Sequence, residues 1–141
     1  MKNPHVSSPA QGVSIGGASA RSGVSARMIR HYESLGFLPD VLRTDSGYRQ
    51  YSDADIHSLC FIHRARALGF SMAAIGELLS LWHDRARSSA SVRKIAQAHL
   101  AELEARIASM QAMHQVLADL VKGCHGDARP DCPILNDLAQ R

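Results

Sequence analysis

The longest regular pattern of apolar positions lies in the C-terminal half of the chain. Between about Ser88 and Lys122 the chain contains neither proline nor glycine, so one long helix is predicted there. The side chains along one face of this helix recur at alternating steps of three and four residues: Leu100, Leu103, Ile107, Met110, His114, Leu117 and Val121. Such a heptad seam requires a partner helix, and the chain contains no second copy of it. We therefore expect a homodimer, with parallel or antiparallel helices.

Two shorter helical patterns precede the middle of the chain and are separated by the sequence SGVS. Gly23 can adopt the left-handed conformation that ends the first helix, and Ser25 can cap the second. In the second helix Met28, Ile29 and Tyr32 recur at helical spacing. Two short helices joined by a tight, glycine-containing turn form a helix-turn-helix.

A small hairpin is predicted next, because Asp45-Ser46-Gly47 is a turn sequence between two extended stretches. Arg43, Tyr48 and Arg49 flank this turn. Arginine and tyrosine side chains bind the sugar-phosphate backbone of DNA, so a hairpin at this place is typical of a DNA-binding wing. An ordinary surface hairpin is the alternative.

Two amphipathic helices follow the hairpin. Ser52 and Asp55 form the start of a capping box, and Ser71 caps the next helix. The apolar face of the first of these helices is predicted to consist of Ile56, Leu59, Cys60, Ile62, His63 and Ala67. Cys60 is thus expected to be a small buried side chain. The second helix has Ile75, Leu78, Leu79 and Trp82 on its apolar face.

Composition narrows the class of protein. Aromatic residues make up only 5% of the chain, which favours a mainly α protein. The net charge of +3 permits nucleic acid as a partner without requiring it. Neither a membrane span nor a signal peptide is expected, so we predict a cytoplasmic protein with reduced thiols and no membrane partner. Residues 1–13, rich in serine, proline and glycine, are predicted to be a disordered tail.

The order of these parts resembles the MerR family of dimeric transcription regulators. The blocks RMIRHYESLGFLP, RTDSGYRQYSDADI and IHRARALGFSMAAIGELL carry this resemblance, which covers residues 14–141. The terminal block CHGDARPDCPIL resembles the metal loop of the copper-efflux branch, the CueR-like regulators. That branch responds to Cu(I), Ag(I) or Au(I).

The resemblance implies a fold and a set of partners. A winged helix-turn-helix domain would span residues 14–84, an antiparallel coiled-coil dimerisation helix 85–123, and a metal loop with a short terminal helix 124–141. The homodimer would bind promoter DNA with an overlong spacer and deform it, so that RNA polymerase reads both promoter elements. By matching the family pattern, the residues expected at the DNA are Arg27, Arg30, Tyr32, Arg43, Tyr48, Arg49 and Arg66.

The chemistry of the terminal loop can be assessed from its own residues. Lys122 and Gly123 close the long helix, with Gly123 expected as its C-cap, and Pro133 suits the first turn of a following short helix. Cys132 then stands at the N-cap, where backbone N–H groups stabilise a thiolate. Two sulfur ligands, Cys124 and Cys132, suit a soft monovalent ion, whereas zinc prefers four ligands. His125, Asp127 and Asp131 are possible additional ligands.

The resemblance also bears on the choice of metal. The zinc and mercury branches have a cysteine at the start of the long helix, and the matching position here is Ser89, a poor ligand for a soft ion. The copper branch usually has proline after its first loop cysteine, where this chain has His125.

We therefore predict a transcription activator, not an enzyme, with Cys124 and Cys132 as metal ligands. Divalent-metal sensing and redox sensing through a Cys124–Cys132 disulfide are the alternatives. A thiol enzyme is disfavoured because the chain has neither a Cys-X-X-Cys motif nor a nucleophile elbow. A metal chaperone would not need a wing.

Overall fold

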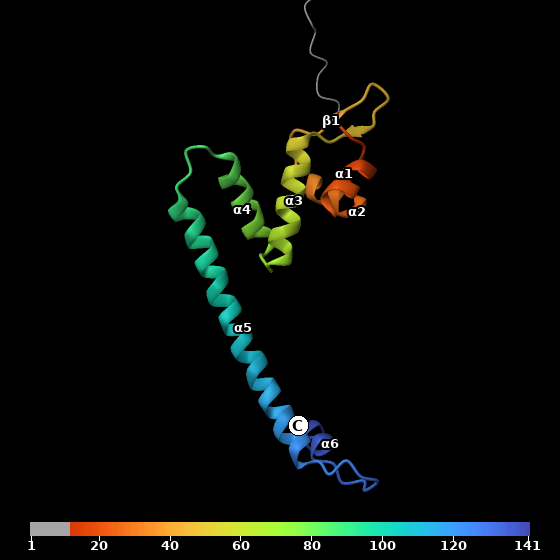
Figure 1. Cartoon of the computed structure of the whole chain (residues 1–141), viewed down its shortest axis with the longest axis vertical. Coiled ribbons are helices and arrows are strands. Elements are labelled where there is room, and N and C mark those ends of the chain that lie inside the picture. Colours follow the sequence, from red (N-terminus) through yellow and green to blue (C-terminus); the bar gives the residue numbers. More distant parts are fainter. Residues whose placement is uncertain (1–11) are drawn as a thin grey trace, which may run out of the picture. The chain divides into compact units, whose positions relative to one another are not determined.

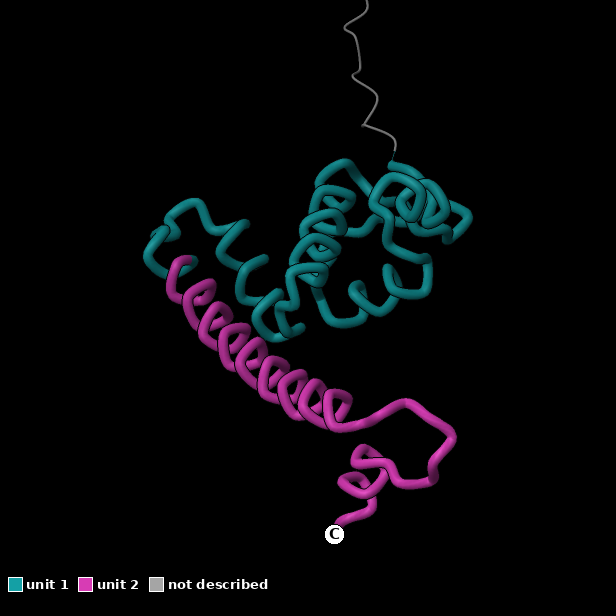
Figure 2. The backbone as a smooth tube through the Cα atoms, turned by 60° about the horizontal axis from the view of Figure 1, so that its bottom comes forward, with its two compact units in different colours: residues 1–92 teal, residues 93–141 magenta. Residues whose placement is uncertain are grey.

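The computed structural model describes residues 12–141 and is mainly α-helical, as predicted. In chain order the elements are α1 (Ile15–Ser22), α2 (Ala26–Ser34), β1 (Leu42–Arg43), β2 (Arg49–Gln50), α3 (Asp53–Ala67), α4 (Met72–His83), α5 (Ser89–Gly123) and α6 (Pro133–Leu138) (Figure 1). The chain divides into two compact units, residues 1–92 and residues 93–141 (Figure 2). None of the helices in the described part of the chain is both long enough and apolar enough to cross a membrane.

The predicted helix-turn-helix is present in the first unit. Ser14 Oγ accepts a hydrogen bond from the Gly17 N–H at 3.2 Å and caps α1, while Ser25 Oγ accepts from the Met28 N–H at 3.2 Å and caps α2. Gly23 between them has φ 78°, a left-handed conformation that glycine adopts without steric cost. The local signals at Gly23 and Ser25 are thus confirmed.

The core of the first unit lies between these two helices and the pair that follows the wing. α3 packs against α1 and against α4, and α1 packs against α2. The largest fully buried side chains come from α2, α3, α4 and the segment between the wing and α3: Ile29, Tyr51, Leu59, Ile62 and Ile75. The sequence pattern correctly predicts Ile29 and Tyr32 on α2 and Ile75 and Leu79 on α4 as buried, but Trp82, which it placed on the apolar face of α4, is 44% exposed.

The N-terminal boundary differs from the prediction at its last residue. Most of the tail expected over residues 1–13 lies outside the described residues. Val13, however, pairs with Tyr51 in an antiparallel bridge, with both N–H···O distances at 2.8 Å. Val13 is therefore part of the fold, because its extended backbone satisfies the N–H and carbonyl groups of Tyr51.

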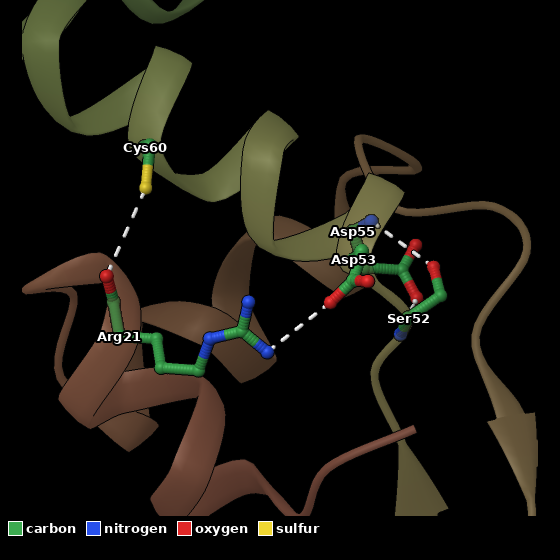
Figure 3. A network of polar contacts seen from close by, with 5 residues as sticks. All are labelled: Arg21, Ser52, Asp53, Asp55 and Cys60. Carbon is green, nitrogen blue, oxygen red and sulfur yellow. Dashed lines mark hydrogen bonds and ion pairs between the residues drawn. The ribbon is translucent and has the colours of Figure 1, made fainter. Parts of the chain in front are cut away.

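The predicted capping box opens α3 (Figure 3). Ser52 Oγ accepts from the Asp55 N–H at 3.1 Å, and Asp55 Oδ2 accepts from the Ser52 N–H at 2.8 Å. Next to it, Arg21 Nη1 donates to Asp53 Oδ1 at 3.2 Å, an exposed ion pair between α1 and α3. Such a pair contributes little stability, so packing and capping hold these helices together.

The burial predicted for Cys60 is wrong. Its side chain is exposed, and its Sγ lies 4.0 Å from the carbonyl oxygen of Arg21 (Figure 3). His63 and Ala67 are exposed as well. The buried face of α3 consists instead of Asp55, Ile56, Ser58, Leu59, Ile62 and Ala65. That stripe follows helical periodicity. It includes Asp55 and Ser58, which a search for apolar residues does not find because both side chains are polar.

The second unit has a different character. It contains most of α5 and the short α6, and its seam side chains face solvent in the single chain: Leu100, Ile107, Met110, Leu117 and Val121 are each more than half exposed. The C-cap predicted at Gly123 is wrong, because Gly123 is the last helical residue and has no positive φ. The left-handed glycine lies three residues later, at Gly126, with φ 62°.

Candidate nucleic-acid interface and metal-binding loop

Two of the three residues predicted on α2 lie on its exposed face. Arg27 and Arg30 are both exposed and lie three positions apart along the helix, so they project from neighbouring turns on the same face. Tyr32 is only 4% exposed and stacks with Phe37 at a ring-centroid distance of 6.3 Å. The structure therefore assigns Tyr32 to the core and not to the DNA-facing set, because it shares the inward stripe with Ile29.

The predicted wing is a two-stranded antiparallel hairpin. Arg43 pairs with Arg49 across β1 and β2, and the connecting turn is closed by a hydrogen bond from the Thr44 N–H to the Tyr48 carbonyl at 2.7 Å. Thr44 Oγ1 also accepts from the Tyr48 N–H at 3.1 Å. The Tyr48 side chain is 74% exposed, and Arg43 Nη1 reaches the Gly47 carbonyl at 3.4 Å.

The wing and α2 share a pocket of about 230 Å³. Its lining combines side chains of α2 and the wing with the first residues of α1: Ser14, Ile15, Arg30, Gly47, Tyr48 and Arg49. The Arg30 guanidinium and the positive end of the α1 dipole make this pocket suited to an anion such as phosphate, while the Arg49 guanidinium in its lining is paired with Glu33. The structure thus brings together three of the predicted residues, Arg30, Tyr48 and Arg49.

Two exposed residues of the predicted set lie outside both this pocket and the wing. Arg27 does not line this pocket, and Arg66 is exposed on α3, with its Nη1 3.1 Å from Met72 Sδ. Both remain accessible to a large ligand such as a DNA duplex.

Glu33 is a residue of this region that sequence reasoning missed. Its Oε2 accepts from Arg49 Nε at 2.6 Å, and its Oε1 lies 3.5 Å from the Tyr51 hydroxyl. Burial is the main cause of the raised pKa of Tyr51, and the Glu33 carboxylate raises it further. The available signal was a lone carboxylate on α2 near its buried stripe, where an acid requires a partner.

The terminal loop brings its two ends together. Gly123 ends α5 and Pro133 occupies the first turn of α6, and a Cβ atom placed on Gly123 would lie 3.8 Å from Pro133 Cγ. Cys124 and Cys132 adjoin these two residues, are half-buried and are free thiols. Gly126 has a left-handed backbone conformation, which allows the chain between Cys124 and Cys132 to reverse its direction. The two predicted sulfur ligands therefore lie between the end of α5 and the start of α6.

The N-cap position of Cys132 is confirmed, and its thiol is activated. The backbone N–H of Leu135 is the main cause of its lowered pKa. The N–H of Ile134 and the Cys124 thiol act in the same direction, against partial desolvation. The Cys132 side chain does not form a capping hydrogen bond. Its pKa is therefore lowered by nearby backbone N–H groups that do not meet the geometry of a hydrogen bond to the sulfur.

The other donors of the loop are less available. Asp127 forms an ion pair with Arg129, at 2.6 Å to Nη2 and 2.7 Å to Nε, and the Arg129 side chain is the main cause of its lowered pKa. His125 and Asp131 are exposed. Within residues 12–141, no three His, Cys, Asp or Glu side chains are grouped so as to hold a metal ion.

Comparison with known proteins gives consistent matches. The family described as "MerR HTH family regulatory protein" matches residues 13–82, and "MerR, DNA binding" matches residues 56–120. "Heavy metal-dependent transcription regulator 2" of Rhizobium meliloti (strain 1021) is 53% identical over 127 residues, which cover 90% of this chain and 86% of that protein. The regulator CueR of Salmonella typhimurium is 35% identical, covering 90% and 92%.

A solved structure extends the likeness to the fold. The transcription regulator PbrR691 from Ralstonia metallidurans CH34, in complex with lead(II), superposes with a TM-score of 0.77 at 29% identity. The match covers 90% of this chain and 99% of that one.

Proposed function

The chain belongs to the MerR family of helix-turn-helix transcription regulators, and from this premise we propose that it is a homodimeric activator responding to Cu(I), Ag(I) or Au(I). It is a metal-responsive, DNA-binding regulator and not an enzyme. What we propose beyond this is the monovalent ion, its two ligands, the dimer and the contacts with DNA and RNA polymerase.

The observation that carries the proposal is the pair Cys124 and Cys132, set between two helix ends, with the pKa of Cys132 lowered by backbone N–H groups. Thiolates are the ligands that Cu(I) prefers. Two thiolates and one monovalent ion carry a net charge of −1, which the N–H groups at the start of α6 offset. The relationship to CueR at 35% identity supports the same choice.

The exposed seam of α5 supports the dimer. A row of apolar side chains at heptad spacing, each more than half exposed, is stabilised when a second copy covers it. We propose an antiparallel pairing, with the two α2 helices in successive major grooves and the wings on the flanking backbone. The proposed DNA contacts are made by Arg27, Arg30, Arg43, Tyr48 and Arg66.

Activation follows from a shift between two states of the dimer. When Cys124 and Cys132 share one ion, the loop becomes fixed and α6 docks on the partner subunit, which biases the dimer toward its activating state. The bound promoter is then bent and untwisted, so that RNA polymerase reads both of its elements. Deforming DNA in this way costs on the order of 1–6 kcal/mol, which a few kcal/mol of metal-linked energy and extra contacts can offset.

Divalent-metal sensing is a second candidate, favoured by the likeness to PbrR691, whose structure contains lead(II). It is the weaker candidate for two reasons. Ser89, the first residue of α5, offers a hydroxyl where a third sulfur is needed, and Asp127 is already bound by Arg129.

An anaerobic titration of the full-length protein with Cu(I) and, separately, Zn²⁺ tests the proposal. X-ray absorption is expected to find two sulfur neighbours around Cu(I), and Cu(I) is expected to activate transcription in vitro. Cys124→Ser and Cys132→Ser should each bind DNA and lose metal induction. Cys60→Ser is the matched control and should behave as wild type, because Cys60 lies on α3 and outside the loop.

Two results would contradict this assignment. Four donors around the bound ion, or induction by Zn²⁺ at lower free concentration than Cu(I), would favour the divalent sensor. Full induction in either loop-cysteine variant would exclude the two-sulfur site.

A further inference from the structure

The recognition helix α2 contains one acidic side chain, Glu33, at the end of the sequence ARMIRHYES. A carboxylate next to a DNA surface repels phosphate, so its presence on this helix calls for a physical reason. Its contacts supply one. Glu33 binds Arg49 of the wing at 2.6 Å and lies 3.5 Å from the hydroxyl of Tyr51, which is fully buried. The side chains of Glu33 and Arg49 are 18% and 37% exposed, so this ion pair is partly withdrawn from solvent.

The wing needs such an anchor. Its strands are two residues long each, and a hairpin of this size has little stability of its own. Two contacts tie its second strand to the rest of the unit: the backbone bridge between Val13 and Tyr51, and the side-chain contacts of Glu33. Glu33 is the one that fixes β2 directly against α2.

We propose that Glu33 is a positioning residue for DNA binding, which sets the wing relative to the recognition helix by holding Arg49 and Tyr51. Arg49 is then a strut between the two DNA-contacting elements, and not an independent phosphate ligand as the family pattern implies. This inference rests on the proposed DNA-binding function. It explains why an acid lies among the arginines of this surface.

The inference and simple electrostatics predict opposite signs. Glu33→Gln removes a negative charge near the DNA, so electrostatics alone predicts tighter binding. If Glu33 positions the wing, the same substitution weakens binding, because the hydrogen bond between Arg49 and an ionised carboxylate is replaced by a weaker one.

The test uses the full-length protein and a DNA duplex that the wild type has selected from a random-sequence pool. Fluorescence anisotropy is expected to show that Glu33→Gln binds this duplex about tenfold more weakly. Glu77→Gln is the matched control, since Glu77 is an exposed glutamate on α4 of the same unit. It makes the same change in charge and is expected to bind as tightly as wild type or slightly more tightly.

A double-mutant cycle with Arg49→Gln separates a strut from a phosphate ligand. If Arg49 is a strut, the double variant Glu33→Gln/Arg49→Gln binds the duplex with about the same affinity as the single variant that has the lower affinity. The slope of the logarithm of the DNA-binding constant against the logarithm of the salt concentration then equals that of the wild type. An independent phosphate contact would instead give additive losses and reduce that slope by about 0.9 for Arg49→Gln. That result, or unweakened binding by Glu33→Gln, overturns the inference.

A fold defect would be recognised separately. Circular dichroism and thermal unfolding report whether each variant is folded at the temperature of the binding assay. Arg49→Lys is the second variant, because it keeps the positive charge but loses the Nε–H that binds Glu33. If Glu33 positions the wing through this hydrogen bond, Arg49→Lys binds the duplex more weakly than wild type. Binding as tight as that of the wild type would overturn the inference. If the wild type selects no duplex at all, it is the proposed DNA-binding function that fails.

Discussion

The two units of this chain differ in how they cover their apolar side chains. Every buried apolar side chain of the described residues belongs to the first unit, between Ala18 and Leu79. In the second unit, Ile107, Met110 and Val121 are 54%, 64% and 59% exposed. The first unit thus satisfies its hydrophobic pattern within one chain. The second has an equally regular pattern and leaves it uncovered, so its stability must come from association.

The largest effect is expected from breaking the seam. Ile107→Asp removes an apolar side chain from both copies and introduces a charge, which should weaken the dimer by at least about 3 kcal/mol, or more than a hundredfold. Analytical ultracentrifugation measures the dissociation constant. Ala105→Asp, on the opposite face of the same helix, is the control and should leave the dimer intact. A dimer unaffected by Ile107→Asp would show that the seam is not the interface.

A core substitution in the first unit should lower the stability of the fold and leave dimerisation unchanged. Leu59 is fully buried, so Leu59→Ala is expected to lower the free energy of unfolding by about 2–5 kcal/mol. Urea denaturation measures this loss, while the dimer dissociation constant under native conditions should remain that of wild type. A large change in dimerisation would mean that the core of the first unit also supports the dimer.

Helix capping provides a smaller effect in the first unit. Ser52→Ala removes the hydroxyl that accepts from the Asp55 N–H and should cost about 1 kcal/mol in unfolding free energy. Ser46→Ala, in the exposed turn of the wing, serves as the comparison and should change stability by less than about 0.5 kcal/mol. Equal effects at the two serines would contradict the capping box.

The smallest effect concerns the thiol of the second unit. The pKa of Cys132 is lowered from its ordinary value of 9.0, so its thiolate stabilises the folded state above that pH. This contribution is lost as the pH falls through the folded-state pKa. In a Cys60→Ser/Cys124→Ser variant, ultraviolet absorbance of the thiolate should show a midpoint below 9.0 in the folded protein and a higher midpoint in urea. Identical midpoints would show that the N–H groups of α6 do not act on the sulfur.

Sequence reasoning succeeded where the signal was local. Ser25, Ser52 and Ser71 each cap the helix predicted for them, because a capping hydroxyl and its N–H partner are three residues apart. Pro133 and Cys132 likewise occupy the predicted positions at the start of α6. These features depend on backbone geometry within one turn, which neighbouring residues largely decide.

It failed where a side chain's surroundings come from distant parts of the chain. Cys60 lies next to Leu59 on α3, and the packing of α1 and α4 against this helix leaves Leu59 buried and Cys60 exposed. Tyr32 fits both an apolar stripe and a DNA-contacting motif, and Phe37 lies beside its ring in the core. The Glu33–Arg49 pair joins residues sixteen apart and has no sequence signature.

The sequence by itself determined the helices, their serine N-caps, the heptad seam and the two loop thiols, because these follow from periodicity and from hydrogen bonds between near neighbours. Tertiary structure decided which face of α3 is buried, that Tyr32 is a core residue and that Arg49 is bound by Glu33. Those outcomes depend on the direction in which whole elements pack, and that direction is set by the sum of many distant contacts.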